Sequence, residues 1–119
     1  MDRILEGIKN IIQEEQIFID DSTRRQKAVD LYALRLYQKH VGWEPILPKM
    51  VVQPNNTVEV SKLLSFCNEH NIKVVPYGGG SGVLGGAETI SEDTIVIDVS
   101  KLNVIKEVEE TDLYVTCGA

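Results

Sequence analysis

The chain has 119 residues, of which 43% are hydrophobic and 25% are charged, and this composition excludes a disordered tail. Twelve basic against eighteen acidic residues give a net charge of -6, the wrong sign for a protein that binds duplex nucleic acid or an anionic membrane surface. No apolar run approaches the roughly 20 residues of a membrane span, and the N-terminus lacks the apolar stretch of a signal peptide. We therefore expect a cytoplasmic protein without a nucleic-acid partner and without a membrane span.

Residues 1–47 are predicted to form a helical lead-in. Within 3–16, the apolar residues recur as one stripe of an amphipathic helix, made of Ile4, Leu5, Ile8, Ile11 and Ile12. Its polar face mixes charges of both signs, which favours packing on its own domain or a partner chain over binding to a membrane. Asp21 or Ser22 is a suitable cap for a second helix, predicted to run to about residue 40, where Gly42 interrupts it.

A strand, a helix and a second strand follow within about 30 residues and predict a βαβ unit. Residues 50–52 form a short β-branched strand. Asn56, with Glu59 three residues later, is a capping-box arrangement that opens a helix, and Asn71 is suited to end it in a left-handed conformation. The strand at 72–76 ends in a proline, which has no N–H to donate, so this strand is predicted at an edge of the sheet.

The last third of the chain is predicted to add strands at 94–99, 104–108 and 113–117, the last two joined by a charged turn at 109–112. The predicted fold class is therefore α+β, with N-terminal helices followed by a βαβ unit and an antiparallel hairpin that form a small mixed sheet. Cys67 and Cys117 lie far apart without a CxxC spacing, so we expect two reduced, partly buried thiols and no metal site.

The segment from Pro76 to Gly86 holds six of the nine glycines in the chain. Glycines after a strand let the backbone adopt positive φ, and successive main-chain amides curled in this way form a nest that binds anions. A phosphate group is the predicted ligand. A flexible glycine-rich turn without a ligand is the structural alternative.

Neither of the standard nucleotide-binding motifs fits this loop. Gly80 to Gly85 matches GxGxxG, but that fingerprint requires a following helix, and residues 86–93 are too short and too polar to provide one. The P-loop pattern fails because Gly86 and Ala87 stand where lysine and serine or threonine belong. The loop is therefore predicted to hold phosphate by main-chain hydrogen bonds, with Ser81 as its only hydroxyl inside the glycine run.

Five ordered stretches carry a resemblance to a known family: 51–54, 57–60, 74–82, 97–103 and 115–119. Together they resemble the FAD-binding domain of the vanillyl-alcohol-oxidase and para-cresol-methylhydroxylase type. Within that type they are most similar to FAD-linked 2-hydroxy-acid oxidoreductases, such as the glycolate oxidase large subunit and D-lactate dehydrogenases. The resemblance covers residues 48–119, and residues 1–47 resemble the lead-in of this branch more weakly.

The resemblance implies that the glycine loop wraps the FAD pyrophosphate. The cofactor-binding residues that it implies are Pro76, Tyr77, Gly78, Gly79, Gly80, Ser81, Gly82, Gly85 and Gly86. Some members of the family tether FAD covalently through a histidine near this loop. Here position 81 is serine and no histidine follows His70, so we expect non-covalent FAD.

The resemblance also implies that residues 48–119 are the first lobe of a two-lobed FAD-binding domain, incomplete at its C-terminus. The catalytic residues of the family lie in the part that is absent, so none is assigned to this chain. We expect a truncated, split or degraded piece without turnover on its own. An exposed apolar patch would attract a complementing polypeptide or a second copy, and a small 2-hydroxy acid would be the substrate only of the complete enzyme. Two alternatives are a non-catalytic module for another phosphorylated ligand or nucleotide, and a structural or assembly protein with a relic glycine loop.

Overall fold

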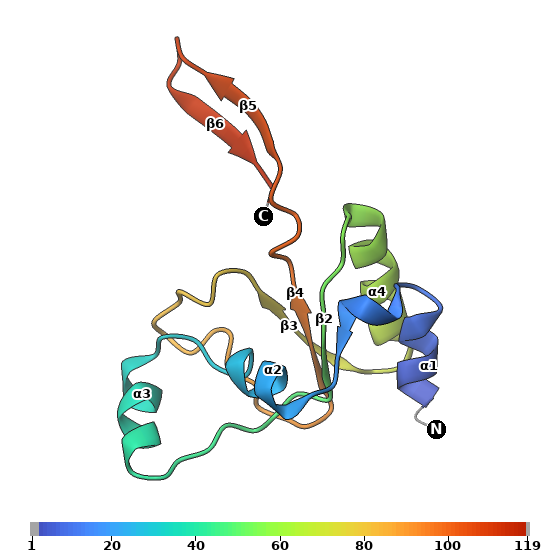
Figure 1. Ribbon diagram of the computed structural model, residues 1–119, viewed down its shortest axis with the longest axis vertical. Coiled ribbons are helices and arrows are strands. Elements are labelled where there is room, and N and C mark those ends of the chain that lie inside the picture. Colours follow the sequence, from blue (N-terminus) through green and yellow to red (C-terminus); the bar gives the residue numbers. More distant parts are fainter. Residues whose placement is uncertain (1–2, 119) are drawn as a thin grey trace.

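The computed structural model describes residues 3–118, so Ala119 of the predicted lobe lies outside the described residues. Helices pack on a four-stranded sheet, and a separate hairpin projects from this body (Figure 1). The elements in chain order are α1 (Arg3–Lys9), a 3-10 helix (Glu14–Gln16), β1 (Ile17–Phe18), α2 (Asp21–Gln26), α3 (Ala33–His40), β2 (Met50–Val52), α4 (Thr57–Glu69), β3 (Lys73–Tyr77), β4 (Thr94–Asp98), β5 (Ile105–Glu109) and β6 (Tyr114–Cys117).

The main sheet has the strand order β1-β2-β4-β3. Strands β2 and β3 both run parallel to β4, which lies between them, and β1 is antiparallel to β2. The βαβ unit is therefore confirmed, with β4 inserted between its two strands. Strand β3 lies at the edge, as the proline in it predicted.

Helix α4 begins and ends where the sequence places its caps. The side chain of Asn56 accepts a hydrogen bond from the Glu59 amide at 2.9 Å, and the Glu59 carboxylate accepts one from the Asn55 amide at 2.8 Å. This second bond is the main reason that the pKa of Glu59 lies below its ordinary value. At the other end, Asn71 adopts a φ of 54°, the left-handed conformation that ends the helix.

Helices α1 and α4 cover one face of the sheet (Figure 1). Ile8 of α1, Leu63 of α4 and Ile95 of β4 are fully buried in this core. On the other face, Val51 and Val96 pack with the ring of Tyr77, and Ala87 of the returning glycine loop packs against them. The glycine loop is thus attached to the second face of the sheet.

The lead-in differs from its prediction in two places. The first helix ends at Lys9, and the chain then passes through the 3-10 helix at Glu14–Gln16 into strand β1, which pairs with β2. The predicted helix between residue 21 and about residue 40 is two short helices, because residues 28–31 make hydrogen bonds to the glycine loop in place of helical ones.

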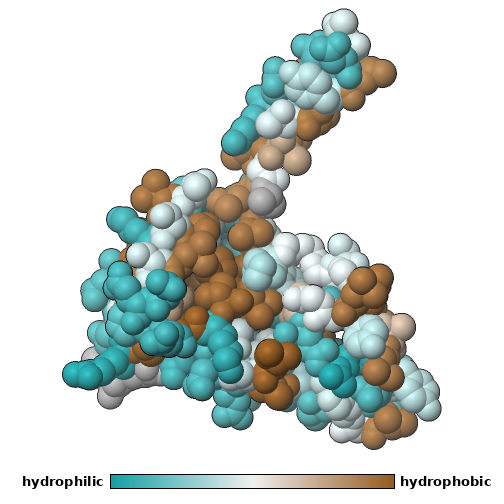
Figure 2. Space-filling view, turned by 180° about the vertical axis from the view of Figure 1, so that it is seen from behind, coloured by the Kyte–Doolittle hydropathy of each residue, from teal (hydrophilic) through white to brown (hydrophobic). Residues whose placement is uncertain are grey.

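The hairpin β5–β6 is antiparallel, as predicted, but forms a sheet of its own, so the mixed sheet consists of β1 to β4. Its side chains are exposed, and Figure 2 shows hydrophobic residues on the projecting part as well as across the body below it. The exposed large hydrophobic residues in this region are Val104, Ile105, Val108, Leu113, Tyr114 and Val115. Cys67 is buried, whereas Cys117 on β6 is exposed, which corrects the expectation of partial burial for the second thiol.

Candidate functional site

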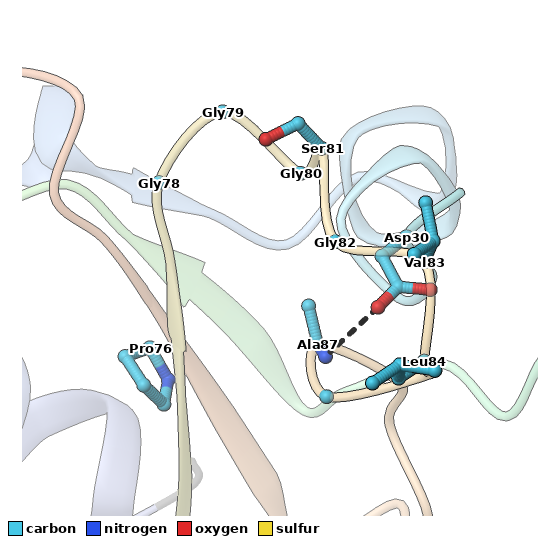
Figure 3. A pocket seen from close by; sticks show the side chains of 11 residues that line it. Asp30, Pro76, Gly78, Gly79, Gly80, Ser81, Gly82, Val83, Leu84 and Ala87 are labelled. Atoms are coloured by element: carbon cyan, nitrogen blue, oxygen red, sulfur yellow. Dashed lines mark hydrogen bonds between the residues drawn. The ribbon is translucent and has the colours of Figure 1, made fainter. Parts of the chain in front are cut away.

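The glycine loop leaves the sheet where β3 ends, beside the C-terminal end of β4. Figure 3 shows an arch that rises from Pro76 through Gly78, turns over at Gly79 and returns through Gly82 to Ala87. No helix or strand forms between residues 78 and 93, so the structure excludes the helix that a dinucleotide fingerprint requires. The arch borders a cavity of about 430 Å³, lined by Asp30, Pro76, Gly78, Gly79, Gly80, Ser81, Gly82, Val83, Leu84, Gly86 and Ala87.

Seven of the nine predicted cofactor-binding positions line this cavity, and Tyr77 and Gly85 do not. The Tyr77 ring is buried against the second face of the sheet. Gly85 lies on the return of the arch, where a side chain would contact the ring of Tyr32. Both residues therefore shape the loop from outside the cavity.

The main-chain amides of the arch are not used by the protein itself. Within residues 3–118, no amide from Gly78 to Gly86 donates a hydrogen bond to a protein acceptor, although the carbonyls of Gly82 and Gly85 accept one each. The arch residues are exposed or only partly buried, so these amides are open to solvent, and a run of unpaired amides beside a cavity favours an anionic ligand. The loop is therefore free to hold phosphate oxygens, and it is not a turn whose amides bond to its own fold.

Two features of the glycines bear on this cavity. Gly80 has a φ of 66°, and a Cβ placed there would overlap the ring and hydroxyl of Tyr77. At Gly78, Gly79 and Gly86, a Cβ would meet nothing within 4 Å. Gly80 is thus required by its backbone conformation and neighbours. The other three keep the backbone open to close approach by a ligand.

Asp30, Val83, Leu84 and Ala87 line the cavity without having been predicted. Asp30 is only 5% exposed, and its Oδ1 accepts a hydrogen bond from the Tyr32 amide two residues later, at 3.0 Å. Such a turn is a common role of aspartate, and this signal was hidden because Asp30 falls in the middle of an expected helix. Val83 and Leu84 are exposed, with Leu84 at 88%, and form an apolar rim.

A buried ion pair lies beside the base of the arch. The ammonium of Lys27 is 3.0 Å from Oδ2 of Asp98 and 4.4 Å from the centre of the Tyr77 ring. Burial raises the pKa of Asp98, but hydrogen bonds from Ser100 and the charge of Lys27 outweigh this and leave the pKa below its ordinary value. The carboxylate thus remains charged, and it ties the lead-in to the end of β4.

The other reactive side chains lie elsewhere. Neither His40 nor His70 lines the cavity, and Nδ1 of His70 is 2.9 Å from the carbonyl of Phe66 in its own helix. Burial raises the pKa of the Cys67 thiol, as expected for a core cysteine. Among residues 3–118, no group of three or more histidine, cysteine, aspartate or glutamate residues is arranged to hold a metal. Over the same residues, no helix has the length and apolar character to cross a membrane.

Comparison with known proteins gives a family match over residues 48–119, to the model described as FAD binding domain. An uncharacterized FAD-linked oxidoreductase of Escherichia coli, YgcU, is 29% identical over 117 residues, which are 97% of this chain and 24% of that protein. Mitochondrial D-lactate dehydrogenase (cytochrome) 1 of Saccharomyces cerevisiae is 28% identical over 121 residues, covering 100% of this chain and 20% of that protein. The glycolate oxidase subunit GlcD of Bacillus subtilis is 36% identical over 70 residues, 59% of this chain and 15% of that protein.

Solved structures share the fold. An alkyldihydroxyacetonephosphate synthase superposes with a TM-score of 0.83 at 23% identity, covering 93% of this chain and 22% of the other. A p-cresol methylhydroxylase superposes with a TM-score of 0.68 at 14% identity, covering 90% of this chain and 20% of the other. The chain thus spans about a quarter or less of the length of these relatives.

Proposed function

This chain belongs to the FAD-binding domain family of the vanillyl-alcohol-oxidase and p-cresol-methylhydroxylase type, and from that premise we propose that it is the diphosphate-binding lobe of an FAD-linked oxidoreductase that acts on a 2-hydroxy acid. The observation that carries the proposal is the run of unpaired amides from Gly78 to Gly86 around the cavity. The substrate class rests on similarity to proteins named D-lactate dehydrogenase and glycolate oxidase subunit.

The residues of the cavity fit the diphosphate of FAD. Two phosphates in sequence need several donors along a curved line, and the arch supplies these as main-chain amides without a competing side chain at Gly78 or Gly79. The apolar rim of Val83 and Leu84 lies next to the amides. This combination suits a ligand that carries aromatic rings on either side of its phosphates.

In this proposal the chain binds and orients the cofactor. Bound FAD would supply the capacity to accept two electrons from a hydroxy acid. The amides of the arch donate hydrogen bonds to the phosphate oxygens, and Ser81 offers its hydroxyl as a further donor. Because Ser81 stands in the loop and neither histidine lines the cavity, the chain holds FAD without a covalent bond. Recognition of the substrate and removal of its proton belong to other parts of the complete protein.

Titration of the purified chain with FAD, ADP, AMP and riboflavin tests the proposal. We expect FAD to bind and ADP to compete with it, because both contain the diphosphate. AMP should bind at least about tenfold more weakly than ADP, since one phosphate and its charge-assisted hydrogen bonds are lost. Calorimetry and flavin fluorescence measure these affinities.

Riboflavin, which has the ring system but no phosphate, is the matched control and should show no saturable binding. Riboflavin that binds as well as FAD would contradict the role of the amides. Binding of ADP without FAD would favour the alternative of a non-catalytic module for another phosphorylated ligand.

A further inference from the structure

Two points on the side of the glycine arch that follows Gly79, one where it descends and one where it returns to the sheet, are fastened to consecutive residues of the lead-in. The amide of Leu31 donates to the carbonyl of Gly82 at 2.8 Å, on the descending arm. The amide of Ala87, on the returning arm, donates to Oδ2 of Asp30 at 3.4 Å, a bond visible in Figure 3. Asp30 and Leu31 therefore hold the part of the arch between Gly82 and Ala87, which contributes to the lining of the cavity.

Further contacts continue this attachment along the return of the loop. The amide of Thr89 donates to the carbonyl of Ala28 at 2.9 Å. The guanidinium of Arg35 donates to both carboxylate oxygens of Glu88, with Nε at 2.9 and 3.0 Å and Nη2 at 2.7 Å. Arg35 is itself held by the ring of Trp43, 4.5 Å below it. A paired, stacked arginine is a rigid anchor because little side-chain freedom is left to it.

All the lead-in residues of this attachment lie before residue 48, outside the part of the chain that matches the family. The attachment places two carboxylates, those of Asp30 and Glu88, close to a loop whose expected ligand is an anion. A carboxylate beside a phosphate site weakens binding by charge repulsion unless it contributes in another way. Here the oxygens of both carboxylates are occupied by donors of the attachment.

We infer that residues 28–35 are a clamp that presets the glycine arch for its ligand, with Asp30 and Glu88 as positioning residues; this rests on the proposed binding of a diphosphate by the arch. The clamp acts by reducing the loss of loop entropy on binding, since the segment between Gly82 and Ala87 is held in place before the phosphates arrive. Without it, the run of glycines has few restraints of its own.

Because the two carboxylates are charged, the direction in which the affinity for FAD and ADP changes on their removal tests the clamp. Asp30→Asn and Glu88→Gln each remove one negative charge beside the anion site. Electrostatics alone predicts tighter binding of FAD and ADP, whereas loss of the clamp predicts weaker binding. Asparagine at position 30 turns an amide group toward one of the two N–H donors, so we expect about a tenfold loss of affinity, in line with a broken hydrogen bond to a charged group. Glu88→Gln keeps one acceptor for Arg35 and should lose about threefold.

Glu92→Gln is the matched control, because Glu92 lies on the same return segment, is exposed and makes the same change of charge. Its affinity for FAD should stay within about twofold of wild type. Hydrogen exchange of the free proteins adds a second readout. Amides of residues 78–90 should exchange faster in Asp30→Asn, while those of β4 keep their protection. If Asp30→Asn does not fold, Glu88→Gln carries the test because glutamine has a similar size and still offers Arg35 an acceptor.

If wild type binds FAD, and both Asp30→Asn and Glu88→Gln bind it equally well or more tightly, the clamp is overturned and the proposed function remains intact. Wild type that binds neither FAD nor ADP overturns the proposed function and the clamp with it. Weaker binding in both variants, with the Glu92→Gln control unchanged, supports the clamp.

Discussion

Gly80→Ala is expected to remove measurable FAD binding and to lower the free energy of unfolding by about 2–3 kcal/mol. Alanine is strained at a φ of 66°, and its Cβ would overlap the ring of Tyr77. That ring is packed against Val51 and Val96, so it cannot yield without disturbing the second face of the sheet. The backbone of the arch must therefore move, and the directions of its amides move with it.

Gly86→Ala is the control for stability, since position 86 has no positive φ and a Cβ there meets nothing within 4 Å. Its free energy of unfolding should stay within about 0.5 kcal/mol of wild type. Chemical denaturation and FAD titration measure the two effects. A Gly80→Ala protein with wild-type stability and wild-type affinity would contradict the described loop geometry.

Lys27→Met is expected to lower the free energy of unfolding at neutral pH by about 2 kcal/mol. The side chain of Asp98 is 4% exposed, and Lys27 is its partner in the ion pair, so methionine leaves a buried charge without its counter-charge. Gln53 and Ser100 still donate to that carboxylate, which limits the loss. The double variant Lys27→Met/Asp98→Asn removes both charges and should recover most of the stability.

The pH dependence of stability has a definite sign. The pKa of Asp98 is lower in the folded protein than its ordinary value, so its contribution is fully present above the unfolded pKa of about 3.9. That contribution is lost as the pH falls through the lower, folded pKa. In Lys27→Met the pKa of Asp98 rises, so the loss begins at a higher pH. Unfolding curves measured between about pH 3 and pH 7 check this. A free energy of unfolding that begins to fall at the same pH in Lys27→Met as in wild type would contradict it.

The sequence predicts those parts of the fold that depend on local signals. The cap at Asn56 and the left-handed Asn71 define helix α4, and Pro76 indicates an edge strand, because each is a property of one residue and its backbone. The glycine arch was predicted for the same reason. Its lack of a following helix could be read directly from the polar segment after Gly86.

The remaining features depend on tertiary contacts. The lead-in has helical spacing through Asp30, yet its amides and carbonyls there bond to a loop about 50 residues later. Local propensity cannot anticipate a partner so distant. Strand β1 is similarly decided by pairing with β2. The alternation in β5 and β6 predicted the hairpin, but it could not tell whether the hairpin would join the main sheet.

Binding of a diphosphate by the main-chain amides of the arch can be followed residue by residue in the amide NMR spectrum of the isotopically labelled chain during a titration with ADP. We expect saturable shifts concentrated on the amides of residues 78–86, with those of α4 and the β5–β6 hairpin unchanged. Saturation by ADP with shifts confined to another surface, or an arch spectrum that does not change at all, would contradict it.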